Sequence, residues 1–348
     1  MNYPEKLKKG DTIGICAPSG GISKLIKQQR LDEAIKKLKE MGYKVIETSS
    51  VRKEEKGRSG TAKQRAEEFM QLLENEDVKL ILFATGGDYL VEILKYLDLE
   101  KIKKLKPKWM QGFSDITVIE FLFNTVLDIP SIYCDTVKSY AMKPLYKNLI
   151  DALKIASGES VIQKSFEKCE KSNLDINEGF VEQNDINAGY DLTQNVKWKN
   201  LKGEEKIEIQ GRMLGGCLDI IQMFFGTKYD NINKYIEKYK KDGIIWYLEC
   251  FEMNSSEVTR IMWQMKNAGY FKNVNGIIFG RNLFYRQDYG ITFEEAVLEE
   301  IGDLEIPIIC DADIGHVAPQ MAIVNGGLMK IISENGKGII GYDTKLNY

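Results

Sequence analysis

The sequence predicts an α/β fold in two domains, the first built on a doubly wound parallel sheet and the second of mixed α and β structure. Short apolar runs alternate with amphipathic helical patterns through the first 150 residues, and such alternation implies right-handed crossovers between parallel strands. The chain has 348 residues, 43% of them hydrophobic, which is enough to give each of two domains its own core.

Five short runs rich in Ile, Val, Leu and Phe are the expected parallel strands of the first domain. They are residues 11–17, 43–47, 78–84, 108–112 and 129–134. Apolar residues recur at helical spacing between them, at 31–41, 62–73 and 90–97, and Thr61 with Gln64 forms a capping-box pattern before the second helix. Ligands of such sheets bind beyond the carboxyl ends of the strands.

A polar stretch rich in Asn, Glu, Lys and Gly follows, and it is expected to be a linker that folds as a lid over a site. Beyond it, strands are expected at 243–249, 276–281 and 305–310, with a helix closed by Gly269 and a hairpin around the turn 334–337. The expected domains are therefore 1–157, the linker or lid 158–206, and 207–348.

Composition excludes several function classes. Forty-eight basic and 51 acidic residues give a net charge of −3, which disfavours nucleic-acid binding. No 18 apolar residues run together, and the N-terminal apolar stretch is too short for a signal peptide, so no membrane span or export is expected. The six cysteines form no C-x-x-C pair, which is typical of reduced thiols in a cytoplasmic enzyme.

The chain contains one histidine, His316, so any imidazole base must be this residue. It lies in a loop that follows the expected strand 305–310, where side chains are presented at a sheet edge. Two alternatives stay open. The histidine can be a structural or surface residue, or Asp311, Asp313 and His316 can be metal ligands, although three ligands from one loop make a poor transition-metal site.

Ser114 is a candidate nucleophile. It follows the expected strand 108–112 and precedes a helical pattern, and a serine at such a turn holds its hydroxyl at the carboxyl edge of the sheet. The motif Gly-Phe-Ser-Asp is not the G-x-S-x-G signature, and the alternative is a simple helix N-cap.

Two further elements could complete a hydrolytic site. Gly86-Gly87 ends the preceding strand, where bare backbone amides can approach an oxyanion or a phosphate. Glu249 ends an apolar strand, where a buried carboxylate needs a partner, and Glu252 is its nearby competitor. No G-x-G-x-x-G pattern occurs, so a dinucleotide cofactor is unsupported and no cofactor is expected.

With these residues in hand, the chain resembles the LD-carboxypeptidase family of serine peptidases, which also contains the microcin C immunity proteins. The resemblance spans nearly the full length. It is carried by Gly10-Asp11, Ala17-Pro18-Ser19, Gly86-Gly87, Gly112-Phe113-Ser114-Asp115-Ile116-Thr117, Gly211-Arg212-Met213-Leu214-Gly215-Gly216, Gly226-Thr227, Leu248-Glu249, Gly280-Arg281 and Gly315-His316.

The resemblance implies a flavodoxin-like N-terminal domain, a smaller C-terminal β/α domain and a homodimer. It also implies Ser114 as nucleophile, His316 as general base and then acid, and Glu249 as the carboxylate that holds the imidazole. The backbone N–H groups of Gly87 and Asp115 are implied as the oxyanion hole. Because the serine falls in one expected domain and its partners in the other, the cleft is expected at the domain interface.

This sequence departs from the common family pattern near the expected substrate. Thr85 stands where many LD-carboxypeptidases have an arginine that could clamp a carboxylate, and Asp88 follows Gly87 where Tyr-Gly is common. Cys217 replaces a common asparagine. Trp198 in the polar stretch either stacks on a base or sugar, as an immunity-type lid would, or simply packs. Gly86, Thr85, Asp88 and Trp198 are thus candidate substrate-binding residues.

We therefore expect a cytoplasmic, metal-free serine hydrolase that removes the terminal D-amino acid from murein tetrapeptides during peptidoglycan recycling. Its partner is a small peptide or peptide conjugate. The alternative within enzymes is hydrolysis of peptidyl- or aminoacyl-nucleotide conjugates, as by the immunity proteins. A catalytically silent ligand-binding protein is the alternative from another class.

Overall fold

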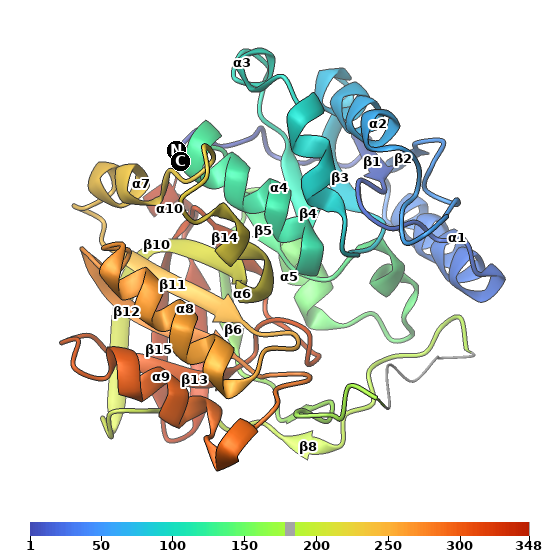
Figure 1. The fold of residues 1–348 in the computed structure, drawn as a ribbon. Coiled ribbons are helices and arrows are strands. Elements are labelled where there is room, and N and C mark those ends of the chain that lie inside the picture. The colour runs from blue at the N-terminus through green and yellow to red at the C-terminus, as the bar shows by residue number, and fades with distance from the viewer. Residues whose placement is uncertain (178–184, 348) are drawn as a thin grey trace. The chain divides into compact units, whose positions relative to one another are not determined.

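The computed structural model describes residues 1–177 and 185–347, and these divide into two compact units (Figure 1). The first unit comprises residues 1–161 with 185–189 and 347. The second comprises 162–177 and 190–346.

The first unit is built on a parallel sheet with the strand order β2-β1-β3-β4-β5. In chain order this is the 2-1-3-4-5 arrangement of flavodoxin-like folds, so the expected doubly wound parallel sheet is confirmed. All five expected strands are present within one to two residues of their predicted ends. Their bounds are β1 Thr12–Cys16, β2 Lys44–Glu47, β3 Val78–Phe83, β4 Trp109–Gly112 and β5 Ser131–Tyr133.

Helices flank this sheet, as the blue to green part of Figure 1 shows. The α-helices are α1 Leu25–Glu40, α2 Ala62–Glu74, α3 Leu99–Ile102, α4 Thr117–Leu122 and α5 Lys147–Ala156. Short 3₁₀ helices are η1 Leu90–Tyr96, η2 Ser114–Ile116 and η4 Val137–Ala141, and η3 Phe123–Leu127 is a π-helix. The central strands β1, β3, β4 and β5 are almost wholly buried and form the core.

Three local expectations for this unit need correction. Strand β2 is mostly exposed rather than buried, because it is an edge strand with a neighbour on one side only. The segment that begins at Leu90 forms a 3₁₀ rather than an α-helix. Thr61 caps α2 by accepting from the Gln64 N–H (3.2 Å), but the Gln64 side chain donates to Glu68 instead, so only half of the capping box forms.

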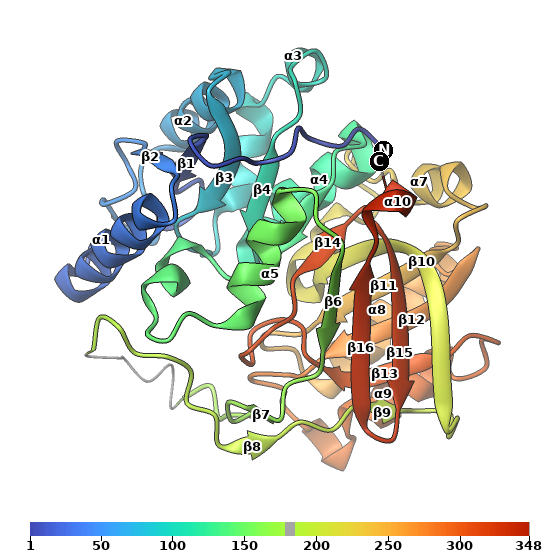
Figure 2. The ribbon, with the colours of Figure 1, turned by 180° about the vertical axis from the view of Figure 1, so that it is seen from behind.

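The second unit is built on a mixed sheet with the order β6-β16-β15-β10-β11-β12-β13-β9 (Figure 2). Strands β10 to β13 are parallel, whereas β15, β16 and β9 run antiparallel to their neighbours. The strands are β6 Val161–Lys164, β7 Lys168–Cys169, β8 Gln194–Asn195, β9 Lys199–Asn200, β10 Lys206–Cys217, β11 Ile244–Glu249, β12 Val274–Gly280, β13 Ile308–Ala312, β14 Ile323–Asn325, β15 Leu328–Glu334 and β16 Lys337–Tyr342. The helices are α6 Leu218–Ile221, η5 Gln222–Phe224, α7 Ile232–Lys238, α8 Ser255–Asn267, η6 Asp288–Gly290, α9 Phe293–Ile301 and α10 Thr344–Asn347.

The expected hairpin is confirmed, since β15 pairs antiparallel with β16 across Asn335-Gly336, both at positive φ (51° and 74°). The polar stretch 158–206 carries the short strands β6 to β9 within its described residues. Part of the expected lid, residues 178–184, lies outside the described residues. All six cysteines, which lie within the described residues, are buried and have reduced thiols. Within residues 1–177 and 185–347, no helix is long and apolar enough to cross a membrane.

Candidate active site

Ser114 lies at the turn where β4 gives way to the short helix η2. Its φ of 66° is left-handed, a conformation that a serine adopts only when its surroundings impose it. Its N–H donates to the Tyr133 hydroxyl (3.3 Å), and Phe113, not Ser114, occupies the N-cap position. The turn therefore has the strained strand-to-helix form of a nucleophile elbow, and capping does not account for the serine.

The glycine pair after β3 packs directly against this serine. A Cβ added at Gly86 would lie 3.1 Å from the Ser114 Oγ and 3.6 Å from the Asp115 nitrogen. Gly87 has a φ of 149°, and a Cβ there would lie 2.4 Å from the Ser19 Oγ. A side chain at Gly87 would clash and one at Gly86 would press on the serine, so a bare backbone loop borders the serine hydroxyl.

Asp115 joins three loops beneath the serine. Its carboxylate is 1% exposed and accepts from the Ser19 hydroxyl and from the Leu90 N–H (3.0 Å). Burial raises the pKa of Asp115 to about 6, with Asp88 adding to the rise, while the two hydrogen bonds and Arg65 oppose it. The residue after the candidate nucleophile thus anchors the loops that follow β1, β3 and β4.

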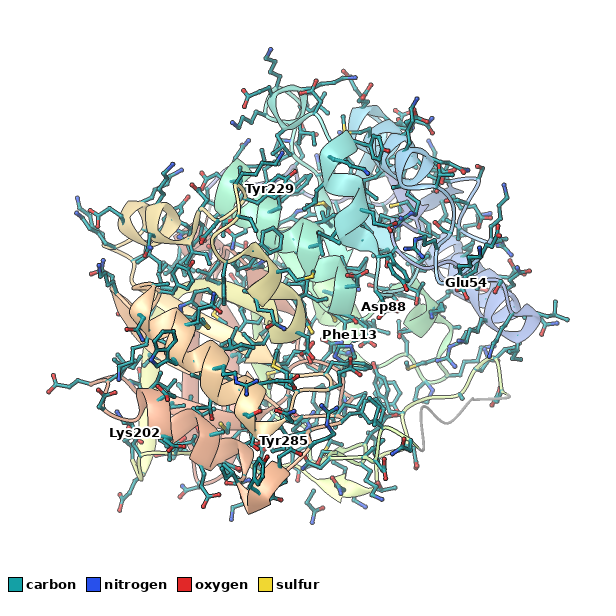
Figure 3. All side chains as sticks on the ribbon, in the orientation of Figure 1. Glu54, Asp88, Phe113, Lys202, Tyr229 and Tyr285 are labelled. Atoms are coloured by element: carbon teal, nitrogen blue, oxygen red, sulfur yellow. The ribbon has the colours of Figure 1, made fainter. Side chains whose placement is uncertain are left out.

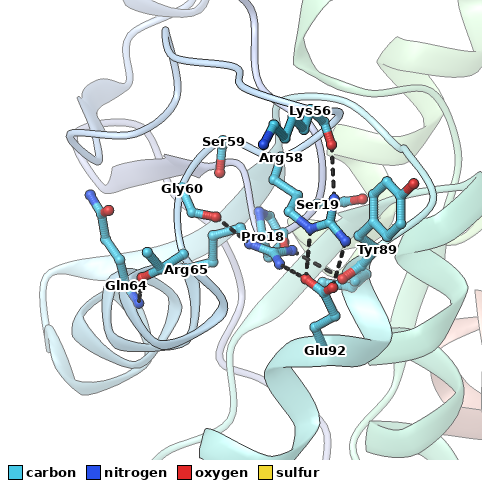
Figure 4. Close-up of polar contacts among 12 residues, drawn as sticks. Pro18, Ser19, Lys56, Arg58, Ser59, Gly60, Gln64, Arg65, Tyr89 and Glu92 are labelled. Atoms are coloured by element: carbon cyan, nitrogen blue, oxygen red, sulfur yellow. Dashed lines mark hydrogen bonds and ion pairs between the residues drawn. The ribbon is translucent and has the colours of Figure 1, made fainter.

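A second polar cluster, centred on Arg65 and Glu92, holds the loops that follow β1 and β3 (Figure 4). The guanidinium of Arg65 is fully buried and donates to Glu92 (2.5 Å), to the Pro18 carbonyl (2.7 Å) and to the Tyr89 carbonyl (3.1 Å). Arg58 pairs with the same Glu92 (2.6 Å) and lies 3.4 Å above the Tyr89 ring. These charge-assisted bonds fix the loops that follow β1 and β3 in one arrangement.

Thr85 and Asp88 flank the glycine pair. The Thr85 hydroxyl accepts from the ammonium of Lys138 (3.2 Å), and Asp88, labelled in Figure 3, is exposed. Sequence reasoning did not single out Lys138. The signal that could have found it is its place after the strand β5, at the same edge of the sheet as Ser114.

In the second unit, Glu249 and His316 form a hydrogen-bonded pair. Glu249 ends β11 and its side chain is 0% exposed, whereas His316 lies in the loop after β13 with its side chain 7% exposed. The His316 Nδ1 lies 2.8 Å from the Glu249 Oε2. A neutral imidazole that donates its Nδ1–H to this carboxylate has Nε2 available to take up a proton. Glu252, the competing carboxylate, is exposed.

Close packing sets the position of this pair. A Cβ at Gly315 would lie 2.5 Å from the Glu249 Cγ, and one at Gly280 would lie 3.1 Å from the Glu249 Cβ. Gly315 also has a φ of 87°. The Phe251 ring lies 4.7 Å from the imidazole, centroid to centroid. The carboxylate and the ring therefore have little freedom to move apart.

The three residues considered as metal ligands have separate partners. Asp311 pairs with Lys199 (2.8 Å), Asp313 pairs with Arg281 (2.6 Å), and His316 contacts Glu249. Within the described part of the chain, no group of three or more His, Cys, Asp or Glu residues could hold a metal ion. This arrangement favours the imidazole as part of an acid-base pair.

Trp198 lies in the core of the second unit. It is 2% exposed, and its indole N–H donates to the buried Asp313 carboxylate (3.0 Å). Its ring occupies the space beside Gly338, where a Cβ would lie 2.4 Å away. In this structure the tryptophan packs and anchors the stretch that precedes β9, while residues 178–184 of the same stretch lie outside the described residues.

The comparisons with known proteins define the class of this protein. The N-terminal domain of LD-carboxypeptidase matches residues 13–134, and the C-terminal domain matches residues 210–331. Together these domains span more than two thirds of the chain. The protein belongs to the LD-carboxypeptidase family and is a serine carboxypeptidase by class.

Relatives match along nearly the whole chain. A putative carboxypeptidase of Vibrio cholerae is 26% identical over 328 residues, 92% of each chain. The microcin C7 self-immunity protein MccF of Escherichia coli is 24% identical over 94% of this chain and 92% of its own. A probable murein peptide carboxypeptidase of Bacillus subtilis is 21% identical, over 94% and 90% respectively.

Solved structures share the fold. MccF in complex with aspartyl sulfamoyl adenosine superposes with a TM-score of 0.74 at 23% identity, over 99% of this chain and 98% of its own. A muramoyltetrapeptide carboxypeptidase from Oxalobacter formigenes gives 0.70 at 21% identity, over 95% and 98%. The two-domain α/β architecture is therefore that of the family.

Proposed function

We propose that this protein hydrolyses the amide bond to the terminal D-amino acid of murein tetrapeptides, with Ser114 as nucleophile, His316 as general base and Glu249 as the carboxylate that orients it. The observation that carries the proposal is the buried 2.8 Å contact between Glu249 and the one imidazole of the chain. An acid-imidazole pair needs a nucleophile to activate, and Ser114 has the strained turn typical of one.

In the proposed reaction, the His316 Nε2 takes the hydroxyl proton of Ser114 as Oγ attacks the scissile carbonyl carbon. The backbone N–H groups of Gly87 and Asp115 are proposed to stabilise the oxyanion that forms. His316 then gives the proton to the nitrogen of the departing D-amino acid, and an acyl-enzyme remains on Ser114. A water molecule, deprotonated by His316, hydrolyses the ester and releases the shortened peptide.

The test is the release of the free D-amino acid from a murein tetrapeptide. We expect Ser114→Ala and His316→Ala each to lower kcat by at least about 10⁴-fold, because triad members act as a unit. Circular dichroism and thermal unfolding establish that the variants fold. Turnover within tenfold of wild type by either folded variant contradicts the proposal.

The second candidate is hydrolysis of peptidyl- or aminoacyl-nucleotide conjugates. It is favoured by the match to MccF over 94% of this chain, since MccF has been solved with aspartyl sulfamoyl adenosine. Incubating the protein separately with a murein tetrapeptide and with that conjugate distinguishes the candidates. Cleavage of the conjugate alone replaces the substrate assignment and leaves the roles of Ser114 and His316 intact, whereas cleavage of neither points to a silent binding protein.

A further inference from the structure

The carboxyl edge of the first unit's sheet gathers four loops. Ser19 follows β1, Thr85 to Gly87 follow β3, Ser114 follows β4 and Lys138 follows β5. Parallel strands end at the same edge, so these side chains approach one another although they are far apart in sequence. The bonds from Lys138 to Thr85 and from Ser19 to Asp115 join the loops in pairs.

Lys138 is a partly buried cation whose ammonium contacts a neutral hydroxyl. Its ammonium donates to the Thr85 hydroxyl at 3.2 Å, and no carboxylate of the described residues lies within ion-pair distance of it. Withdrawing a charge from water without a counter-ion is costly, and titratable groups perturbed in this way cluster at functional sites.

The surroundings of Lys138 add positive charge. Arg30 of α1 donates to the Lys138 carbonyl (3.3 Å), and Lys27 lies on the same helix. Burial, followed by repulsion from Lys27 and Arg30, lowers the pKa of Lys138 to about 8, while Glu54 opposes the shift. Three basic side chains, those of Lys138, Lys27 and Arg30, therefore act on this part of the sheet edge, and Glu54 is the carboxylate that opposes them.

Thr85, which contacts the Lys138 ammonium, is the neighbour of the glycine that borders the proposed nucleophile. Thr85 immediately precedes Gly86, where a Cβ would lie 3.1 Å from the Ser114 Oγ. In a carboxypeptidase substrate, three bonds separate the scissile carbonyl carbon from the carbon of the terminal carboxylate, a span of about 4 Å. The carboxylate of a substrate bound at Ser114 must therefore lie near the glycine loop, and Thr85 joins that loop to the Lys138 ammonium.

We propose that the Lys138 ammonium, held by the Thr85 hydroxyl, binds the free C-terminal carboxylate of the substrate. This inference rests on the proposed function. It names Lys138 as the residue that restricts hydrolysis to the terminal amino acid of the substrate. A substrate that extends beyond the scissile residue, or that ends in an amide, presents no charge to Lys138 and leaves the ammonium unpaired.

The test compares a murein tetrapeptide that ends in D-alanine with the same peptide ending in D-alaninamide. Wild-type kcat/KM is expected to be roughly 10- to 100-fold higher for the acid, the range for a hydrogen bond to a charged group. Lys138→Met should lower kcat/KM for the acid to the level of the amide, mainly by raising KM. The value of kcat/KM for the amide should stay the same, because the amide presents no charge to this side chain. Lys138→Arg should restore part of the preference.

Lys143→Met is the matched control, because its side chain is 64% exposed and pairs with Glu33 (3.5 Å), away from Thr85. A pH profile adds an independent readout. Above pH 8 Lys138 loses its charge, so wild-type KM for the acid should rise, whereas Lys138→Arg should show no such rise. KM for the amide should stay flat over the same range.

Equal losses on acid and amide in Lys138→Met, or equal wild-type turnover of the two peptides, would overturn the role of Lys138 and leave the proposed hydrolysis standing. If wild type cleaves neither peptide, the proposed function fails. The role of Lys138 is then tested by calorimetry, which measures the binding of both peptides to wild type and to Lys138→Met. Tighter binding of the acid that Lys138→Met abolishes supports the carboxylate site, and equal binding rejects it.

Discussion

The two units prepare their functional groups in different ways. In the first unit the backbone does most of the positioning, with Ser114 and Gly87 at positive φ (66° and 149°) and the glycine loop packed on the serine. In the second unit a side-chain pair is positioned, and Glu249 and His316 meet at 2.8 Å in a close-packed pocket beside Gly315.

This difference indicates which kind of mutation should damage each unit. A strained backbone persists only while the surrounding bonds hold it, and here these are the bonds of Asp115 and Arg65 to neighbouring loops. A buried side-chain pair instead depends on the presence of both side chains, because removal of one leaves the other without its partner. Backbone changes should therefore damage the first unit, and changes of single side-chain atoms should damage the second.

Glu249→Gln should produce the largest effect. The amide retains the shape of the carboxylate but can donate to the His316 Nδ1. This bond favours the tautomer that carries its proton on Nε2, and a protonated Nε2 cannot accept the proton of the serine. We expect kcat to fall by roughly 10⁴-fold with little change in the midpoint of thermal unfolding. Glu252→Gln, at an exposed neighbouring position, is the control and should retain wild-type activity. A fall of less than tenfold in Glu249→Gln would show that the carboxylate does not orient the base.

Gly87→Ala tests the backbone of the first unit and should have the next largest effect. The new methyl group would meet the Ser19 hydroxyl at 2.4 Å, so the loop must shift and move the proposed oxyanion donor. We expect a roughly 10²- to 10³-fold loss in kcat, the range for one lost donor.

Gly10→Ala is the control for that experiment. Gly10 also has a positive φ (92°), but nothing lies within 4 Å of an added Cβ. This variant should lose about 1 kcal/mol of stability at the left-handed position and keep its kcat. Similar kinetic losses in both glycine variants would mean that backbone strain in general, and not the loop at Gly87, limits the reaction.

Asp115→Asn tests the first unit through its free energy of unfolding. It should have the smallest effect of these variants. Folding raises the pKa of Asp115 from 3.8 to about 6, so the native state holds the proton more tightly than the unfolded state. The stabilising contribution of Asp115 is therefore present below pH 4 and lost as the pH rises through 6. At about 1.4 kcal/mol per pH unit, the loss is roughly 3 kcal/mol.

Urea unfolding of wild type and Asp115→Asn from pH 4 to pH 7 measures this contribution. The stability of wild type relative to the variant should decline across that range. A difference between wild type and Asp115→Asn that is independent of pH would mean that Asp115 does not titrate in this window.

Much of the fold could be predicted from the sequence because its signals are local. The five strands of the first unit, the Asn335-Gly336 hairpin and the end of α8 near Gly269 all follow from short apolar runs and turn residues. The errors arose where a neighbour decides the outcome. The Gln64 side chain donates to Glu68 and does not complete the capping box. Strand β2 is exposed because it has a neighbouring strand on one side only.

The candidate site divides in the same way. Ser114, Glu249 and His316 could be singled out because each lies at the end of an expected strand or in the loop after it, and because the chain has one histidine. Lys138 and the Ser19 to Asp115 bond could not, since a lysine and a serine are common residues whose meaning depends on what surrounds them. Trp198 was ambiguous in sequence, and its bond to Asp313 shows how it packs.

By itself, the sequence determined the alternation of strands and helices, the family pattern and the residue types available for chemistry, because hydrophobic periodicity and motif spacing are properties of the chain alone. The tertiary structure decided which carboxylate meets the imidazole, which glycine borders the serine and which hydroxyl meets the Lys138 ammonium. These are outcomes of packing between residues distant in sequence, and no local pattern encodes a distance of a few ångströms across a core.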